Sequence, residues 1–304
     1  MHKYRMTLWS LAFAITLSAS CSDPGSLRLA TYTYASNNRI ANLEPLARLL
    51  EEELDRPVDI KSYPDVASFI SGIKSDEVDI ALINTLGYLL LSLDNQNMEV
   101  VTTLKVVEDA QDNYKTVLLT NISNIQSLDG LYQRKGDLSM TFVAEGSTSG
   151  NLVPRLLLSS IGIKSPETEF RSVAYGGNHT STFEQLVRGE TDLCAIGSNE
   201  YFMQLEANPS ISDSIQLLWI SEEIPLGPVL VNRGLSKDDS DKITELLLQL
   251  HQTNDKVLQY VKAGWSEAKQ AEKYYPITDS YYDDFRRVNG NSTDLSEILN
   301  LFKD

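Results

Sequence analysis

Residues 138–161, LSMTFVAEGSTSGNLVPRLLLSSI, hold the pattern that decides the fold. A β-rich apolar run, Leu138–Val143, leads through a small polar loop into an apolar stretch at helical spacing, Leu152–Ile161, which Gly162 ends. Pro154 falls in the first turn of that helix, where its missing N–H costs little. The stretch therefore predicts a strand, a glycine-bounded loop and a helix, in this order.

The same alternation continues on both sides of this unit. The further strand candidates are Leu27–Thr33, Val58–Ile60, Val78–Ile83, Phe170–Val173 and Asp192–Ile196, and the helices between them include Leu43–Leu54, Val66–Lys74 and Phe183–Arg188. Alternation of this kind is typical of parallel sheets with right-handed crossovers. Segment 73–81 resembles segment 186–195, and no low-complexity linker separates the halves. We therefore expect two similar lobes joined by ordered crossing strands.

The loop Gly146-Ser147-Thr148-Ser149-Gly150-Asn151 is the sharpest local feature. Three hydroxyls and unpaired backbone N–H groups at a helix N-terminus favour an anion without any formal cation. A serine-rich capping loop with no ligand is an equally weighted alternative. The loop is not the phosphate-binding loop of nucleotide hydrolases, since no Gly-Lys-Ser/Thr follows. It is not a hydrolase nucleophile elbow either, because its middle residue is Thr148.

His179 stands at the next loop-to-helix junction, within Tyr175-Gly176-Gly177-Asn178-His179-Thr180. A lone histidine is more often structural than functional, but His179 lies on the same predicted rim as the serine loop. Metal ligands at suitable spacing are missing, so we expect no metal and no cofactor. A hydrolase that uses Ser147 or Ser149 with His179 lacks a third orienting group, so we expect no enzyme.

Composition bounds the classes of partner. The 304 residues are 42% hydrophobic and 22% charged, enough for a real core in about two domains of ~150 residues. A net charge of −16 argues against nucleic acid and an anionic membrane surface as partners. A small buried anion is not excluded, because neutral donors can hold it whatever the overall charge. Two cysteines rule out a disulfide scaffold.

The first segment predicts export. Residues 1–20 have a basic start, a short apolar run, Leu8–Leu17, and small residues before Cys21, an order typical of a cleavable signal. The position of Cys21 resembles a bacterial lipobox, although Ser18 stands where leucine is usual. We expect Cys21 to be lipidated and the protein to be an extracytoplasmic lipoprotein, in the periplasm or at the cell surface. The alternative is ordinary cleavage, with Cys21 paired to Cys194.

From Leu27 to about Tyr282 the chain resembles the extracytoplasmic phosphate/phosphite/phosphonate-binding proteins of ABC transporters, a branch of the type II periplasmic binding proteins. The blocks that carry the resemblance are Glu77–Ala81 with Asn84–Tyr88, Tyr114–Leu119, Ser147–Pro154, Gly177–His179 with Gly189–Asp192, Leu218–Pro225 and Tyr275–Tyr282. The Ser-Thr-Ser-Gly-x-x-x-Pro block with a downstream histidine is fairly specific.

The resemblance implies an α/β, two-lobed type II periplasmic binding protein fold. Each lobe would be a small mixed sheet flanked by helices, with a cleft between the lobes. We assign residues 27–112 plus 222–304 to the first lobe and residues 113–221 to the second.

The resemblance also implies a function. Ser147, Thr148, Ser149 and Gly150 would hold a phosphorus oxyanion (phosphonate, phosphite or phosphate). His179 and Tyr114 would donate further bonds, and Tyr88 would contribute from the facing lobe. A monomer would deliver the ligand to an ABC permease by hinge closure. A ligand-sensing or surface lipoprotein of the same fold is the alternative.

One position departs from the family pattern, and the role of another stays open. Members that take amino-alkyl phosphonates have an aspartate in the loop that here reads Pro225-Leu226-Gly227-Pro228, with Gly227 in its place. We therefore expect aminoethylphosphonate not to be preferred. Asn199 and Glu200 lie near the family's other acidic contact, and the role of Glu200 stays open.

Overall fold

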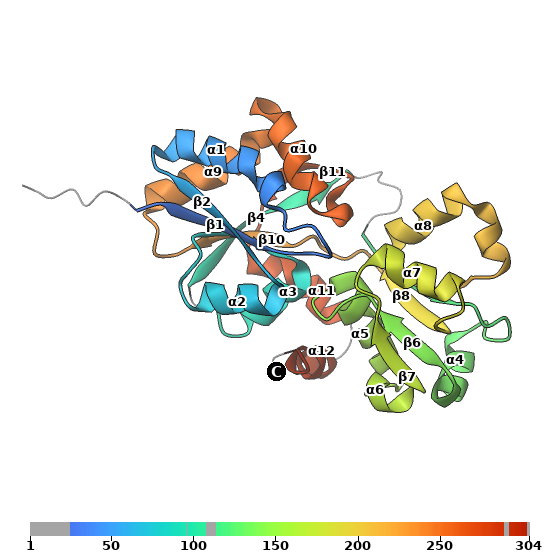
Figure 1. Ribbon diagram of the computed structural model, residues 1–304. Helices are drawn as coiled ribbons and strands as arrows, with labels where there is room; N and C mark the ends of the chain where they lie inside the picture. The colour runs from blue at the N-terminus through green and yellow to red at the C-terminus, as the bar shows by residue number, and fades with distance from the viewer. Residues whose placement is uncertain (1–24, 96, 108–113, 289–291, 303–304) are drawn as a thin grey trace, which may run out of the picture.

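The computed structural model describes residues 25–95, 97–107, 114–288 and 292–302 and places them in two lobes side by side (Figure 1). Within these residues, six strands form one sheet in the order β11-β4-β10-β3-β1-β2, and five form a second in the order β7-β6-β8-β5-β9. The predicted signal segment and Cys21 lie outside the described residues.

The first sheet draws its strands from both ends of the chain. They are β1 (Leu27–Tyr32), β2 (Val58–Tyr63), β3 (Ile80–Leu82), β4 (Met98–Val106), β10 (Pro228–Asn232) and β11 (Ala271–Pro276). β1 pairs in parallel with β2 and β3, whereas β10 runs antiparallel to β3 and β4. The sheet is therefore mixed, as expected.

The second sheet repeats this plan from the middle of the chain. Its strands are β5 (Thr116–Thr120), β6 (Ser139–Phe142), β7 (Ser172–Tyr175), β8 (Leu193–Gly197) and β9 (Gln216–Ile220). β6 pairs in parallel with β7 and β8, whereas β5 runs antiparallel to β8 and β9. The repeated sequence segments thus lead into β3 and β8, which hold equivalent places in the two sheets.

An aspartate before each of these two strands explains the repeat. The Asp79 carboxylate accepts the backbone N–H of Arg28, at 2.8 Å, and pairs with its guanidinium. In the second sheet, the Asp192 carboxylate accepts the N–H of Ser139, at 2.7 Å, and pairs with Arg171. Each aspartate therefore satisfies a donor at the start of the neighbouring parallel strand.

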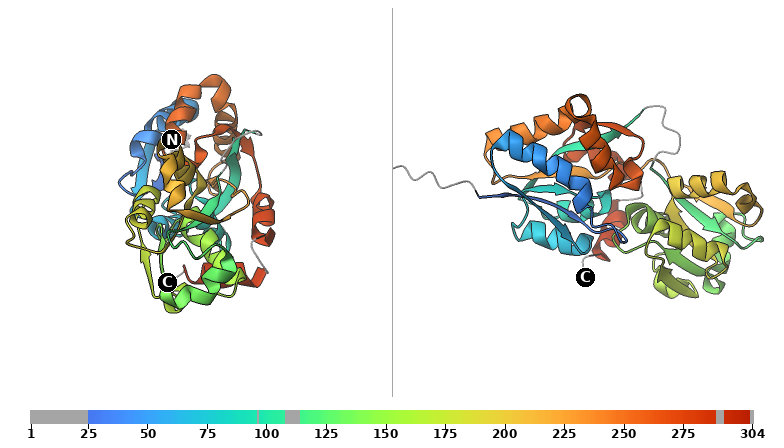
Figure 2. Two further views of the ribbon diagram at one scale, coloured as in Figure 1. Left: turned by 90° about the vertical axis from the view of Figure 1, so that its right-hand side faces the viewer. Right: turned by 45° about the horizontal axis from the view of Figure 1, so that its top comes forward.

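Helices cover both faces of each sheet (Figures 1 and 2). Around the first sheet lie α1 (Ile40–Leu54), α2 (Val66–Lys74), α3 (Thr85–Ser92), α9 (Lys237–Thr253), α10 (Asp255–Ala263) and α11 (Asp283–Val288). Around the second lie α4 (Leu128–Arg134), α5 (Val153–Ser160), α6 (Pro166–Glu169), α7 (His179–Val187) and α8 (Ser198–Ala207). The fold class expected from the sequence is confirmed.

Apolar side chains form one cluster around the first sheet and one on each face of the second. Leu152, Val153 and Leu156 at the start of α5 belong to the first lobe's cluster, whereas Leu157 and Leu158 belong to the second's. The C-terminal helix α12 (Ser292–Asn300) packs against α5. The start of α5 therefore lies at the junction of the lobes.

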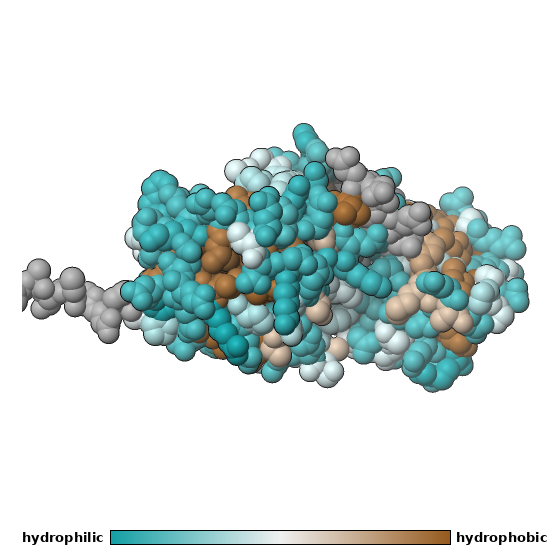
Figure 3. Space-filling view, turned by 90° about the horizontal axis from the view of Figure 1, so that it is seen from above, coloured by the Kyte–Doolittle hydropathy of each residue, from teal (hydrophilic) through white to brown (hydrophobic). Residues whose placement is uncertain are grey.

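The surface is mainly hydrophilic. Figure 3 shows hydrophilic side chains over most of the upper face, with apolar side chains gathered in places on both lobes. Among the described residues, no helix combines the length and apolar character needed to cross a membrane.

Candidate functional site

The serine loop between β6 and α5 forms the turn that the sequence predicts. The Ser147 hydroxyl oxygen accepts the N–H of Gly150, at 3.0 Å, and the Gly150 carbonyl accepts the N–H of Val143, at 2.9 Å. A Cβ at Gly150 would lie 2.3 Å from a Val143 methyl group, so this close approach requires glycine. A π-helical turn, Thr148–Leu152, then leads into α5.

A cavity of about 300 Å³, mouth included, opens beside this loop between the two sheets. Its lining comes from both lobes and consists of Tyr32, Tyr34, Arg39, Asn84, Tyr114, Gly146, Ser147, Thr148, His179 and Glu267. The structure thus brings together four residues predicted from the sequence: Ser147, Thr148, His179 and Tyr114.

Each of the two hydroxyls at the cavity accepts one hydrogen bond from a backbone N–H. Ser147 accepts the N–H of Gly150, and the Thr148 oxygen accepts the N–H of Leu86, at 3.0 Å. Each hydroxyl keeps one proton to donate. Among the described residues, no acceptor bonds the backbone N–H of Thr148 or Ser149. The loop therefore faces the cavity as a set of donors.

His179 also presents a hydrogen-bond donor to the cavity. Asn178 caps α7 by accepting the N–H of Ser181, which places His179 at the first position of the helix. Its Nδ1 atom accepts the N–H of Gly197, at 3.0 Å, so the neutral ring carries its proton on Nε2. Desolvation lowers the pKa of His179 to about 4. At neutral pH it is a neutral N–H donor.

Tyr114 is buried beside the serine loop. Burial raises the pKa of its phenol, which therefore stays protonated, and the hydroxyls of Thr148 and Ser149 lie close to it. The Tyr34 hydroxyl at the cavity is itself buried without a hydrogen-bond partner among the described residues. Both phenols add to the donors on this wall.

Three other predicted residues, Gly150, Ser149 and Tyr88, do not line the cavity. The Gly150 N–H is occupied by Ser147. Ser149 is 1% exposed, and its oxygen has no partner among the described residues. This oxygen and the His179 ring each lie 3.6 Å from where a Cβ on Gly197 would stand, so Ser149 sits just behind the wall.

Tyr88 faces another part of the first lobe. Its hydroxyl donates to Asp279, and its ring packs on Tyr282 with centroids 4.8 Å apart. Glu200 instead accepts from Gln204 within α8, at 2.9 Å. Neither Tyr88 nor Glu200 is among the cavity residues.

Sequence reasoning missed both charged residues of the cavity, Arg39 and Glu267. Arg39 follows β1, whose carboxyl end lies at the cleft, and that position is the one signal that could have pointed to it. Glu267 lies in a short turn after α10, Ser266–Ala268, far along the chain, and nothing in its local sequence marks it.

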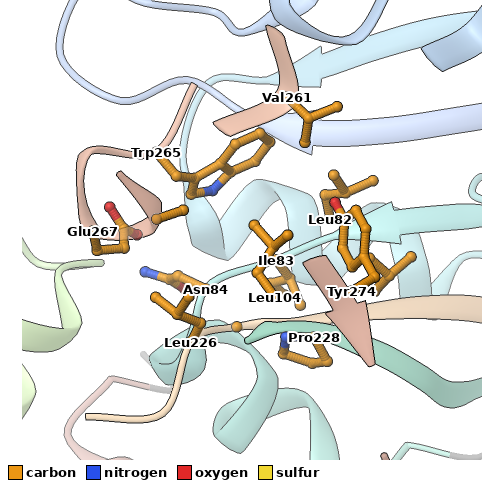
Figure 4. Close-up of a pocket in the computed structure, with 13 residues that line it drawn as sticks. Leu82, Ile83, Asn84, Leu104, Leu226, Pro228, Val261, Trp265, Glu267 and Tyr274 are labelled. Atoms are coloured by element: carbon orange, nitrogen blue, oxygen red, sulfur yellow. The ribbon is translucent and has the colours of Figure 1, made fainter. Parts of the chain in front are cut away.

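An apolar recess of about 390 Å³, its open mouth included, adjoins the cavity in the first lobe (Figure 4). Asn84 and Glu267 belong to both hollows. The remaining lining consists of Leu82, Ile83, Leu104, Leu226, Gly227, Pro228, Val229, Val261, Trp265, Ala268 and Tyr274. A polar cavity thus meets an apolar one at Asn84 and Glu267.

No group of three or more His, Cys, Asp or Glu side chains among the described residues is arranged to hold a metal ion. Cys194 is a free thiol buried in β8, and burial raises its pKa.

Comparison with solved structures gives the same fold. The structure of PhnD1 from Prochlorococcus marinus in complex with methylphosphonate superposes with a TM-score of 0.69 at 18% identity, over 90% of this chain and 100% of that one. A binding protein component of an ABC phosphonate transporter from Pseudomonas aeruginosa gives 0.67 at 19% identity, over 92% and 95%.

Sequence comparison gives the family. The Prochlorococcus marinus protein named a probable ABC transporter phosphite binding protein is 24% identical over 73% of this chain and 74% of its own length. The phosphonates-binding periplasmic protein of Escherichia coli is 25% identical over 77% and 68%. The sequence model of the family described as "ABC transporter, phosphonate, periplasmic substrate-binding protein" matches residues 30–281. The chain therefore belongs to this family of periplasmic substrate-binding proteins, which bind and do not catalyse, as its resemblance predicted.

Proposed function

We propose that this protein captures a phosphorus oxyanion (phosphonate, phosphite or phosphate) in the cavity beside Ser147 and Thr148 and delivers it to an ABC permease. One observation carries the proposal: Ser147, Thr148 and His179 each accept a hydrogen bond from a backbone N–H and keep a proton to donate. A wall of donors is complementary to a ligand that only accepts, which describes an oxyanion.

Tyr114 adds a phenol donor to this wall, and the Ser149 hydroxyl, whose oxygen has no partner among the described residues, lies just behind it. A buried hydroxyl without a partner is costly, so a ligand that reaches Ser149 would gain a bond and remove that cost. The Gly150 N–H supports the site indirectly, since it fixes the Ser147 hydroxyl.

Transport would work by hinge closure between a first lobe of residues 27–112 plus 222–304 and a second of residues 113–221. Three contacts across the cleft support this mechanism. Leu86 donates to Thr148 at 3.0 Å, Asn84 to the Gly146 carbonyl at 2.8 Å, and Asn199 to the Ser266 carbonyl at 3.4 Å. A ligand that binds donors on both lobes would stabilise this closed arrangement.

Lipid anchoring at Cys21 completes the proposal and would hold the protein beside its permease in the membrane. The full burial of Cys194 supports a lipid over a Cys21–Cys194 disulfide, because the Cys194 thiol lies inside the second lobe.

The test is calorimetric titration and thermal shift with methylphosphonate, phosphite, phosphate, aminoethylphosphonate and sulfate. We expect a phosphorus oxyanion to raise the melting temperature of the wild type by mass action. Ser147→Ala with Thr148→Ala should abolish the shift. A matched double variant at exposed positions of the same lobe, Ser123→Ala with Thr168→Ala, should keep it. No shift with any phosphorus oxyanion, or full binding by the cavity variant, would overturn the assignment.

A further inference from the structure

Arg39 is a buried cation at the wall of the cavity. It follows β1, precedes α1 and is 2% exposed. Its Nε atom donates to the Gly264 carbonyl at 2.7 Å, and its Nη1 atom donates to the Tyr32 carbonyl at 3.1 Å. Both bonds go to neutral backbone groups, so neither balances the charge.

Aromatic rings fix the guanidinium in place. Its central carbon lies 4.4 Å from the ring centre of Tyr32, 4.5 Å from that of Trp265 and 5.7 Å from that of Tyr34. Stacked rings hold a guanidinium through its face and leave its edge free for hydrogen bonds. The side chain is therefore oriented before any ligand arrives, which reduces the entropy lost on binding.

Within the described part of the chain, no carboxylate lies within 4.0 Å of the Arg39 guanidinium. The carboxylate that shares its cavity, Glu267, is only partly buried. A buried charge without a close counter-ion costs free energy that an opposite charge can offset.

The backbone conformation of Arg39 also indicates a binding site. Its φ angle is 60°, in the left-handed region that non-glycine residues avoid. Local strain of this kind persists where the surrounding structure over-determines it and is concentrated at binding sites. Here the carbonyls of Gly264 and Tyr32 determine it by anchoring the side chain.

We propose that Arg39 is an anion-binding residue that supplies the positive charge for the ligand, and that the site therefore takes doubly charged oxyanions in preference to singly charged ones of the same shape. The inference rests on the proposed function, which assigned the cavity to neutral donors alone. Ser147, Thr148 and His179 give the site its geometry, and Arg39 gives it a dependence on ligand charge.

The test compares methylphosphonate with methanesulfonate, which has nearly the same shape but one negative charge at all working pH values. Titration at pH 8 should show tighter binding of methylphosphonate to the wild type. Arg39→Met should weaken methylphosphonate binding by roughly 30-fold or more, because the ligand loses its buried counter-charge, and should weaken methanesulfonate binding less. Arg48→Met, at an exposed arginine of α1, should change neither.

Two further variants keep the inference falsifiable if Arg39→Met folds poorly. Arg39→Lys keeps the positive charge but loses the planar guanidinium with its several N–H donors. It should therefore retain the preference for methylphosphonate and bind both ligands more weakly. Glu267→Gln removes the competing carboxylate and should tighten methylphosphonate binding by about threefold or more. If Arg39→Met weakens the binding of both ligands equally, the ratio of their affinities stays as in the wild type. Arg39 then has a purely structural role, and this inference alone is overturned. If the wild type binds no phosphorus oxyanion at all, the proposed function fails with it.

Discussion

The Thr148 hydroxyl oxygen accepts a 3.0 Å hydrogen bond from the backbone N–H of Leu86, and this contact joins the serine loop of the second sheet to α3 beside the first. Both residues are almost fully buried. A single hydroxyl thus satisfies a helix N–H on one side and lines the cavity on the other.

Thr148→Val tests this double role, because valine keeps the shape and removes the hydroxyl. The Leu86 N–H then loses its partner, at a cost of about 1–3 kcal/mol. We expect calorimetric titration with the preferred oxyanion to show binding at least about tenfold weaker. Thr148→Ser, which keeps the hydroxyl, should bind nearly as the wild type does, and wild-type affinity in the valine variant would contradict the role.

His179 makes stability depend on pH. Its folded-state pKa of about 4 lies below the usual value of ~6.5, so the unfolded chain takes up the proton first as the pH falls. The stability that the neutral ring contributes is complete above pH ~6.5 and is lost as the pH falls towards 4. At pH 5 the loss is at most about 2 kcal/mol.

Urea unfolding of the ligand-free protein at pH 7 and pH 5 measures this contribution. His179→Asn, which has no titratable ring, should lose less stability between the two pH values than the wild type. Equal losses in the two proteins would show that protonation of His179 does not govern this range.

Gly227 cannot carry a side chain in this fold. A Cβ at this position would lie 1.9 Å from the Ile83 carbonyl oxygen and 2.6 Å from the Asn84 Cα. Gly227→Ala should therefore reduce the free energy of unfolding by about 2 kcal/mol or more. Gly136→Ala is the matched control, since a Cβ there meets nothing within 4 Å. Similar stability of the two variants in urea would refute the clash. The same crowding opposes an aspartate at this position.

The apolar recess of Figure 4 predicts a preference among phosphonates. If the organic group enters past Asn84 and Glu267, affinity should rise from methyl- to ethyl- to propylphosphonate, by up to ~0.8 kcal/mol per buried methylene. Ala268→Leu, which fills the recess, should remove the gain. A flat series in the wild type would show that the organic group lies elsewhere.

Lipidation of Cys21 predicts membrane association in the native host. Cys21→Ser should release the protein to the soluble extracytoplasmic fraction and abolish incorporation of labelled fatty acid. Cys194→Ser, at the buried thiol of β8, should leave both unchanged. Release of both variants, or of neither, would argue against the anchor.

The sequence predicted the architecture because its signals are local. Strands and helices alternate with recognisable periods, and the aspartates before β3 and β8 mark equivalent turns in the two sheets. The observed ends of some elements differ from the predicted ones where hydrogen bonds decide them. The strand predicted at Phe170–Val173 spans Ser172–Tyr175, because Ser139 pairs with Ser172 in the register of β6 and β7. The predicted helix Phe183–Arg188 begins earlier, at His179, because Asn178 caps it.

By itself, the sequence determined two similar α/β lobes and a donor-rich loop at a helix start, because backbone caps and hydrophobic periods are properties of neighbouring residues. Only the tertiary structure decided which other side chains meet that loop. Tyr88 turns towards Asp279, whereas Arg39 and Glu267, 228 positions apart in the chain, share the wall of one cavity. Such meetings depend on how the sheets and loops pack over long sequence separations, and no local pattern records them.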